Sequence, residues 1–277
     1  MAAYDLTTLA NVKAWLSITS TANDPLLSRL ITASSRFIVN YLSRGEILPA
    51  DYVERQDGYG AGQTRIVLRR WPVVSIASLS LNGGPAIAAS ALPGVNVAPT
   101  SGWLLSDGDS VPPGSQQWLD LFGYCLARGP GAATISYRAG YAVMGEAATV
   151  PASGPYSVTA GQPYGAWGSD LGVTAAGLAL AKVASAPASM QYSVDSAGVY
   201  TFNAAQANVA VKISYGYVPA DLAQAANELV GARFQSRDSI GVNSKSLGGQ
   251  ETVSYDKRDM TGPVAAMLMN YRNVSVF

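Results

Sequence analysis

An internal near-repeat constrains the domain organisation of this chain more than any other feature. Residues 134–141 (TISYRAGY) are echoed by residues 212–217 (KISYGY), and a Val-Pro-Ala triplet follows each copy, at residues 150–152 and 218–220. Between these marks the chain is rich in turn residues, carries few charges and alternates as short strands do. We therefore predict that residues 151–217 form a small all-β domain inserted into a host domain.

Apolar residues at helical spacing predict a helix pair over residues 5–45. Thr7 or Thr8 is expected to cap the first helix, because a hydroxyl can accept a hydrogen bond from a free backbone N–H. Asp24 is the predicted cap of the second helix, and a proline follows it directly. Gly45 is expected to close this helix in a left-handed conformation.

The next region changes from helical spacing to short alternating segments. Asn82 and Gly83 predict a tight hairpin turn, whereas residues 83–114, rich in Gly, Pro, Ala and Ser, are expected to be irregular. Beyond the insert, a helix is predicted to open at Pro219, and a short helix is predicted over residues 263–271. The predicted strands are residues 52–56, 65–68, 76–81, 118–122 and 133–137.

These segments predict an α+β fold in three parts. Residues 1–150 supply the N-terminal part of a core with a helix pair and a small β-sheet, whose strands lie within residues 52–141. Residues 151–217 form the inserted all-β, sandwich-like domain, and residues 218–277 complete the core with a C-terminal helix and a tail. Periodicity assigns to the hydrophobic core the side chains of Trp15, Phe37, Tyr41, Trp71 and Phe234.

Composition argues against several classes of function. The chain has no histidine, so the usual general base, the Ser-His and Cys-His pairs and most zinc sites are excluded. Its 18 basic and 18 acidic side chains give a net charge of zero, so only a local basic patch could attract nucleic acid. We expect no catalytic residue, no cofactor and no metal. A single cysteine, Cys125, and the lack of a long apolar run suggest assembly in a reducing cytoplasm without membrane association.

Three segments, in this order, resemble the head–tail connector (neck adaptor) family of tailed bacteriophages. The first is the helix pair LTTLANVKAWLSITSTANDPLLSRLITASSRFIVNYLSR, and the second is the strand pair YVERQDGYGAGQTRIVLRRWPVVSIASLSLNG. The third is GYVPADLAQAANELVGARFQSRDSIGVNSKSLGGQETVSY, an Ala-rich helix followed by a Gly-Gly loop. The insert is similar to small β modules of other phage structural proteins and lies outside this resemblance.

The resemblance implies a structural protein of the virion neck, assembled in the cytoplasm of the bacterial host. It implies a homo-oligomeric ring, dodecameric to match the portal, with the portal protein on one side and a stopper or tail-completion protein on the other. It also implies that double-stranded DNA passes through the ring without sequence-specific contacts, and that the protein catalyses no reaction.

Within this interpretation, a few charged residues are candidates for subunit contacts or for the channel lining. For Arg65 and Arg69 plain solvation is the simpler reading, and an acidic neighbouring subunit or the DNA channel is the alternative. Arg233 and Arg237 lie one helical turn apart, and Asp238 is adjacent. A salt bridge within or between subunits is as well supported for these three as plain exposure.

The C-terminal tail is a further candidate. Val274, Val276 and Phe277 are apolar residues at a chain end, where apolar side chains gain nothing from exposure to water. We predict that they dock on a neighbouring subunit or on the portal.

The alternatives to a connector are an adhesion or decoration protein and a hydrolase. The insert could make the chain a phage adhesion or decoration protein that binds a host-surface glycan through Tyr156, Tyr164 and Trp167. A carboxylate hydrolase is disfavoured by the absence of histidine and by the low charge. The glycine-rich residues 57–62 lack the Lys-Ser/Thr of a phosphate-binding loop and are predicted to be a hairpin tip.

Overall fold

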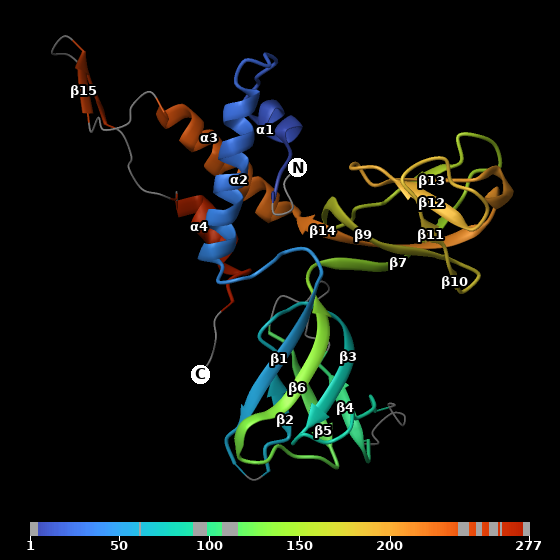
Figure 1. Cartoon of the computed structure of the whole chain (residues 1–277). Helices are drawn as coiled ribbons and strands as arrows, with labels where there is room; N and C mark the ends of the chain where they lie inside the picture. Colours follow the sequence, from blue (N-terminus) through green and yellow to red (C-terminus); the bar gives the residue numbers. More distant parts are fainter. Residues whose placement is uncertain are drawn as a thin grey trace. The chain divides into compact units, whose positions relative to one another are not determined.

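The computed structural model describes residues 5–60, 62–90, 99–106, 116–237, 244–247, 251–254, 260 and 262–273. The chain forms two compact units, which we call the helical unit and the β unit (Figure 1). Among the described residues, the helical unit comprises 5–45, 164–166 and those between 218 and 273, so N-terminal and C-terminal segments both contribute to it. The β unit comprises the described residues of 46–163 and 167–217. The predicted α+β class is confirmed.

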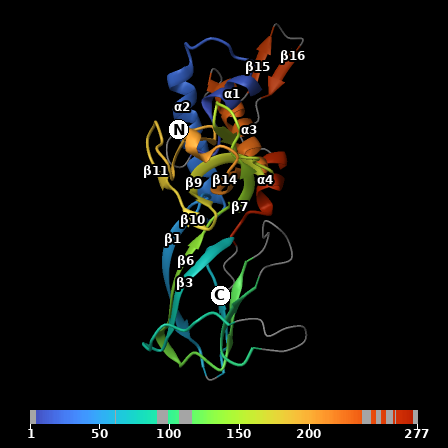
Figure 2. The ribbon, with the colours of Figure 1, turned by 90° about the vertical axis from the view of Figure 1, so that its right-hand side faces the viewer.

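The helical unit is built on two long helices from opposite ends of the chain. Helix α2 (Asp24–Tyr41) packs against α3 (Ala220–Ser236), and α1 (Leu9–Trp15) contacts both of them (Figure 1). Helix α4 (Gly262–Met269) packs on α3, and strands β15 (Ser244–Leu247) and β16 (Glu251–Ser254) pair as a two-stranded ribbon (Figure 2). The buried side chains at the centre are Val12, Leu27, Ile31, Val230 and Phe234.

The helix starts follow local capping chemistry. The Thr8 hydroxyl accepts a hydrogen bond from the Asn11 N–H at 3.1 Å, so the predicted cap of α1 is confirmed. The predicted cap of α2 was wrong by one residue. Asn23 occupies the cap position without a side-chain hydrogen bond, and Asp24 is the first helical residue. The Asp24 carboxylate instead pairs with Lys13 at 2.8 Å.

The prediction that Gly45 closes α2 was wrong. The left-handed residue is Ser43, with φ of 53°. The Ser43 N–H bonds to the Asn40 carbonyl at 3.0 Å and the Arg44 N–H bonds to the Val39 carbonyl at 3.2 Å. This is the Schellman arrangement, which satisfies two of the last helix carbonyls and which a serine can adopt at a modest steric cost.

The first part of the β unit consists of two three-stranded antiparallel sheets. One has the order β1 (Ala50–Gly58), β6 (Gly129–Ala139) and β3 (Val73–Leu81), and the other has the order β2 (Arg65–Val67), β5 (Trp118–Phe122) and β4 (Gly102–Leu105). All five predicted strands are confirmed. Both sheets contribute to one hydrophobic core, whose buried members are Ile66, Leu68, Leu79, Leu81, Leu119, Leu121, Leu126, Ala132, Ala133, Ile135, Tyr137 and Ala139.

Two features of this region concern its turns. Asn82 and Gly83 both have positive φ, of 53° and 72°, and the Gly84 N–H bonds to the Leu81 carbonyl at 2.8 Å, so the predicted hairpin turn is confirmed. Strand β4 was missed, because it lies inside the stretch predicted to be irregular. It is only four residues long, so its alternation of side chains is a weak signal, and it is recognised by its pairing with β5.

The second part of the β unit contains two four-stranded sheets. The first has the order β10 (Leu178–Ala179), β9 (Gly165–Ala175), β14 (Ala210–Pro219) and β7 (Ala142–Thr149). The second has the order β11 (Ala181–Lys182), β12 (Gln191–Val194), β13 (Val199–Phe202) and β8 (Ser157–Thr159), and a 3-10 turn (Ala204–Gln206) precedes β14. Strand β7 pairs along β14, so this sheet begins before residue 151. The insert limits of 151 and 217 stay predictions.

Side-chain burial agrees with periodicity in part. Trp71 and Phe234 are buried, with exposed fractions of 6% and 9%, and Phe37 and Tyr41 are half-buried. Trp15 was wrongly assigned to the core, because it is the last residue of the short α1 and its side chain is 51% exposed. The lone Cys125 is exposed. Among the described helices, none is long and apolar enough to cross a membrane.

Candidate functional site

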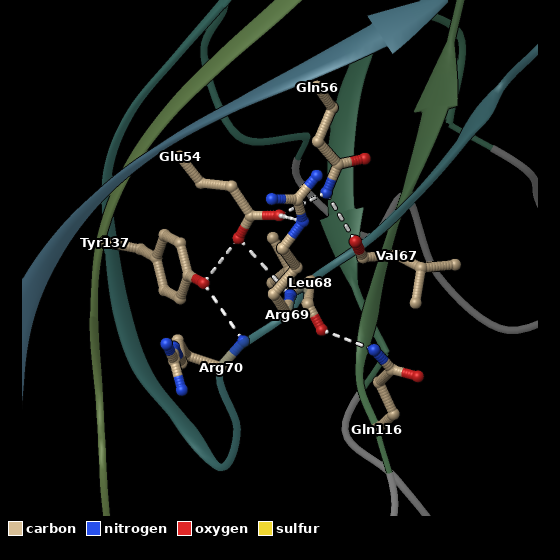
Figure 3. A network of polar contacts seen from close by, with 8 residues as sticks. All are labelled: Glu54, Gln56, Val67, Leu68, Arg69, Arg70, Gln116 and Tyr137. Atoms are coloured by element: carbon tan, nitrogen blue, oxygen red, sulfur yellow. Dashed lines mark hydrogen bonds and ion pairs between the residues drawn. The ribbon is translucent and has the colours of Figure 1, made fainter. Parts of the chain in front are cut away.

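A buried carboxylate organises a polar cluster of the β unit (Figure 3). Glu54, on β1, is only 8% exposed, and the Tyr137 hydroxyl of β6 donates a hydrogen bond to its Oε2 at 2.6 Å. The Arg69 backbone N–H donates to the same oxygen at 3.2 Å, and Gln56 Nε2 donates to Oε1 at 2.6 Å. Arg69 Nε lies 3.3 Å from Oε1, so donors on three segments satisfy the carboxylate.

The same cluster orders the chain between β2 and β3. The Tyr137 hydroxyl accepts a hydrogen bond from the Arg70 N–H at 3.2 Å. Burial, and then the hydrogen bond to the Glu54 carboxylate, raise the pKa of Tyr137 above its usual 10.0. Gln56 Nε2 also donates to the Val67 carbonyl at 2.5 Å. A phenol that stays protonated and a carboxylate with several donors hold the backbone in place, and they offer no activated nucleophile.

The internal repeat produces this pair a second time. The Tyr215 hydroxyl of β14 donates to Glu146 Oε2 of β7 at 2.6 Å, and the Gly161 N–H donates to Glu146 Oε1 at 2.7 Å. Glu146 is half-buried, whereas Glu54 is buried. The sequence signals the two tyrosines through the Ile-Ser-Tyr repeat, but it does not signal their glutamate partners, which lie on other strands.

A third carboxylate with tyrosine partners, that of Asp170, lies in the second part of the β unit. The side chain of Asp170 is 6% exposed and pairs with Lys182 at 3.1 Å. The hydroxyls of Tyr192 and Tyr200 donate to it at 2.8 and 3.2 Å. Burial is the main reason that the pKa of each of these tyrosines lies above 10.0.

The three aromatic residues proposed for glycan binding differ in how far their rings are accessible to a sugar. The Trp167 indole N–H donates to the Tyr200 hydroxyl at 3.2 Å, and a Cβ placed on Gly198 would lie 2.7 Å from its ring. This packing leaves that face of the indole closed to a sugar. Tyr156 is half-buried in the β unit, and Tyr164, which is 42% exposed, belongs to the helical unit. The arrangement gives the adhesion alternative little support.

The sequence-predicted arginines all have partners within the chain. Arg65 pairs with Asp120 at 2.8 Å and lies 4.7 Å from the centre of the Trp118 ring. Arg69 pairs with Glu54, as described above. In the helical unit, Arg233 donates to the Ser34 hydroxyl at 3.1 Å and lies 5.0 Å from the Phe37 ring, and Arg237 lies 3.9 Å from the Phe234 ring.

The described members of the predicted contact residues belong to both units. Arg65 and Arg69 belong to the β unit and Arg233 and Arg237 to the helical unit. Asp238, Val274, Val276 and Phe277 lie outside the described residues. The proposed roles of all eight in subunit contacts or channel lining stay predictions.

Sequence reasoning missed three exposed arginines of the helical unit: Arg29 and Arg36 on α2, and Arg272 after α4. A signal for two of them was present, since residues seven apart on a helix lie on the same face. Arg272 could be found only from the structure, in which its guanidinium lies 5.7 Å from the centre of the Tyr41 ring.

The described residues show little that could hold a small ligand. They include no group of three or more His, Cys, Asp or Glu side chains that could hold a metal. A shallow groove of about 580 Å³ lies on the sheet of β7, β9 and β14, lined mainly by Ala147, Thr149, Thr174 and Ala210, with Lys212 as its single charge. Such short side chains offer neither a deep pocket nor a pair of titratable groups.

Comparison with protein families gives one match. Residues 6–63 match the model of a family described as phage gp6-like head-tail connector protein. The matched segment contains α1, α2 and β1. No curated protein matches the chain. The match confirms the connector resemblance, and the likeness of the insert to modules of other phage proteins stays a prediction.

Proposed function

We propose that this chain, whose residues 6–63 belong to the phage gp6-like head-tail connector family, forms a ring in the virion neck between the portal and the tail. The ring would be dodecameric, would assemble in the bacterial host cytoplasm and would surround the path of double-stranded DNA. Its other partner would be a stopper or tail-completion protein. The family match is the observation that carries this proposal.

The construction of the helical unit supports a role in assembly. Its matched helices α1 and α2 pack against α3, which lies more than 170 residues later in the sequence. The unit is therefore a packed helical domain built from distant segments. Among its described residues, four large apolar or aromatic side chains are exposed: Trp15 at 51%, Leu26 at 36%, Tyr164 at 42% and Met269 at 71%. Exposed tryptophan is a frequent anchor of protein interfaces, and repeated interfaces close a ring.

Assembly can be tested by co-expressing the full chain with the portal protein encoded by the same phage. Mass photometry and negative-stain microscopy should reveal a discrete high-order ring on the portal. Trp15→Ala should raise the protein concentration required for ring formation at least tenfold. Tyr124→Ala, which removes a 41%-exposed ring from the β unit, is the matched control and should leave assembly unchanged. If the chain forms no defined oligomer, alone or with the portal, the proposal is wrong.

The tail has a separate test. The Asn273 N–H bonds to the Leu42 carbonyl at 2.8 Å, and truncation after Asn273 keeps this hydrogen bond. We expect this truncation, which removes Val274, Val276 and Phe277, to weaken docking on the portal or on a neighbouring subunit. Unchanged assembly would show that the tail has no such role.

A further inference from the structure

Four arginines lie along one side of α2. Arg29 and Arg36 belong to this helix, and both are exposed. Arg233 from α3 lies over the Phe37 ring at 5.0 Å, and Arg272 lies over the Tyr41 ring at 5.7 Å. We call these four residues the arginine surface; α2 and α3 can be followed in Figures 1 and 2.

Helix geometry places the arginine surface on less than half of the helix circumference. Two of the guanidiniums belong to α2 residues, at positions 29 and 36. The other two lie over the rings of α2 residues at positions 37 and 41. With 3.6 residues per turn and a rise of 1.5 Å, these positions span about 18 Å along the axis and about 140° around it. The exposed α2 residues between Arg29 and Tyr41 other than the arginines, Ala33 and Asn40, are small or polar, and the exposed Leu26 lies one turn before Arg29.

No carboxylate of the described residues pairs with the arginine surface. Two carboxylates border the surface, and each accepts a hydrogen bond from a hydroxyl: Asp5 from Thr32 at 2.9 Å and Asp221 from Tyr271 at 3.0 Å. Stacking on an aromatic ring orients a guanidinium and leaves its charge in place.

We infer that the arginine surface binds the phosphate backbone of double-stranded DNA. A row of guanidiniums along one helix, with no ion pair to a carboxylate among the described residues, suits regularly spaced phosphates. A protein interface would instead have an apolar centre with charges at its rim. The chain as a whole is neutral, so the contact is local and carries no sequence specificity. The inference rests on the proposed function, in which DNA passes the ring.

The test uses the full chain, free and assembled on the portal, with a fluorescent duplex of about 30 base pairs of random sequence over about 50 to 200 mM KCl. Each phosphate contact contributes about 0.9 to the slope of log K against log salt, so Arg29→Gln/Arg36→Gln should lower this slope by about 1.8. The matched control is Arg55→Gln/Arg128→Gln, which removes two exposed arginines from the β unit. It should leave the slope unchanged.

Two results would overturn the inference: equal losses in both double variants, or no binding of the duplex by the unchanged chain at about 50 mM KCl. Equal affinity for poly-L-glutamate would also overturn it, because it would assign the surface to an acidic protein. Mass photometry on the same samples reports ring assembly. If Arg29→Gln/Arg36→Gln forms normal rings and binds DNA as the unchanged chain does, only the DNA-binding role of the arginine surface is rejected. If the unchanged chain forms no rings, the proposed function is rejected.

Discussion

The Tyr215 hydroxyl donates a hydrogen bond to Glu146 across the β14–β7 strand pair at 2.6 Å. The β6–β1 pair makes the same contact, with Tyr137 donating to Glu54 at 2.6 Å. In both pairs the glutamate lies opposite the isoleucine that precedes the tyrosine by two residues, Ile213 or Ile135. A tyrosine is long enough to reach this diagonal neighbour. The internal repeat of the sequence is therefore a repeated strand-pair geometry.

Removal of the Tyr137 hydroxyl should destabilise the β unit. Tyr137→Phe leaves the buried Glu54 carboxylate and the Arg70 N–H each short of a partner. Leaving buried polar groups unsatisfied costs about 1 to 3 kcal/mol. Urea denaturation followed by tyrosine and tryptophan fluorescence should give a lower midpoint for this variant. Tyr59→Phe is the control, because Tyr59 is 85% exposed, and an equal shift in both variants would contradict the assignment.

Alkaline pH should destabilise the protein through three buried tyrosines. The pKa values of Tyr137, Tyr192 and Tyr200 are raised above the ordinary 10.0, mainly by burial. Because the folded state favours the protonated phenols, their contribution is complete below pH 10 and is lost as the pH rises above it. Each can lower the free energy of unfolding by up to about 1.4 kcal/mol per pH unit.

Tyrosinate absorbance and circular dichroism during an alkaline titration provide the measurement. Part of the tyrosinate signal should appear only together with unfolding, and Tyr137→Phe should make the loss of stability with pH less steep. Complete ionisation of all tyrosines in a folded protein would contradict this prediction.

The glycine-rich segment after β1 offers a matched pair of substitutions. A Cβ on Gly58 would overlap the carbonyl oxygen of Ala127, whereas a Cβ on Gly60 would meet nothing within 4 Å. Gly58→Ala should therefore lower the melting temperature by several degrees, since the backbone of the neighbouring loop has to move. Gly60→Ala should change the free energy of unfolding by less than about 1 kcal/mol. Equal melting temperatures for the two variants would show that the close approach is absent in solution.

The helix caps provide a fourth prediction. Thr8→Ala removes a hydrogen bond to the Asn11 N–H and should cost about 1 kcal/mol. Asn23→Ala occupies the equivalent position of α2, where no side-chain capping bond exists, and should cost only a few tenths of a kcal/mol. Thermal unfolding followed by helix circular dichroism distinguishes the two, and a larger effect at Asn23 would contradict the capping geometry.

Local chemistry explains which parts of the fold could be predicted. The turn at Asn82 and Gly83 and the cap at Thr8 depend on residues next to one another, and both were predicted correctly. The end of α2 was not, because Gly45 is an obvious terminator and Ser43 is not. Strand β4 was missed for another reason, since it depends on a partner strand and not on its own alternation.

Side-chain partners were far less predictable than helices and strands. Arg65 and Arg69 were recognised as candidates, but their pairing with Asp120 and Glu54 depends on how distant strands come together. Trp15 has the spacing of a core residue and is exposed, because the short α1 ends at it. Periodicity describes a helix face, and whether another element covers that face is a property of the packing.

The helices, the five predicted strands, the repeated Ile-Ser-Tyr motif and the resemblance to connectors could be read from the chain alone, because they depend on neighbouring residues. The tyrosine–glutamate pairs and the arginine surface could not. Glu54 and Tyr137 are 83 residues apart, and Arg233 reaches Ser34 across 199 residues. Such contacts exist only after folding brings distant segments together, since no local preference of either residue specifies its partner.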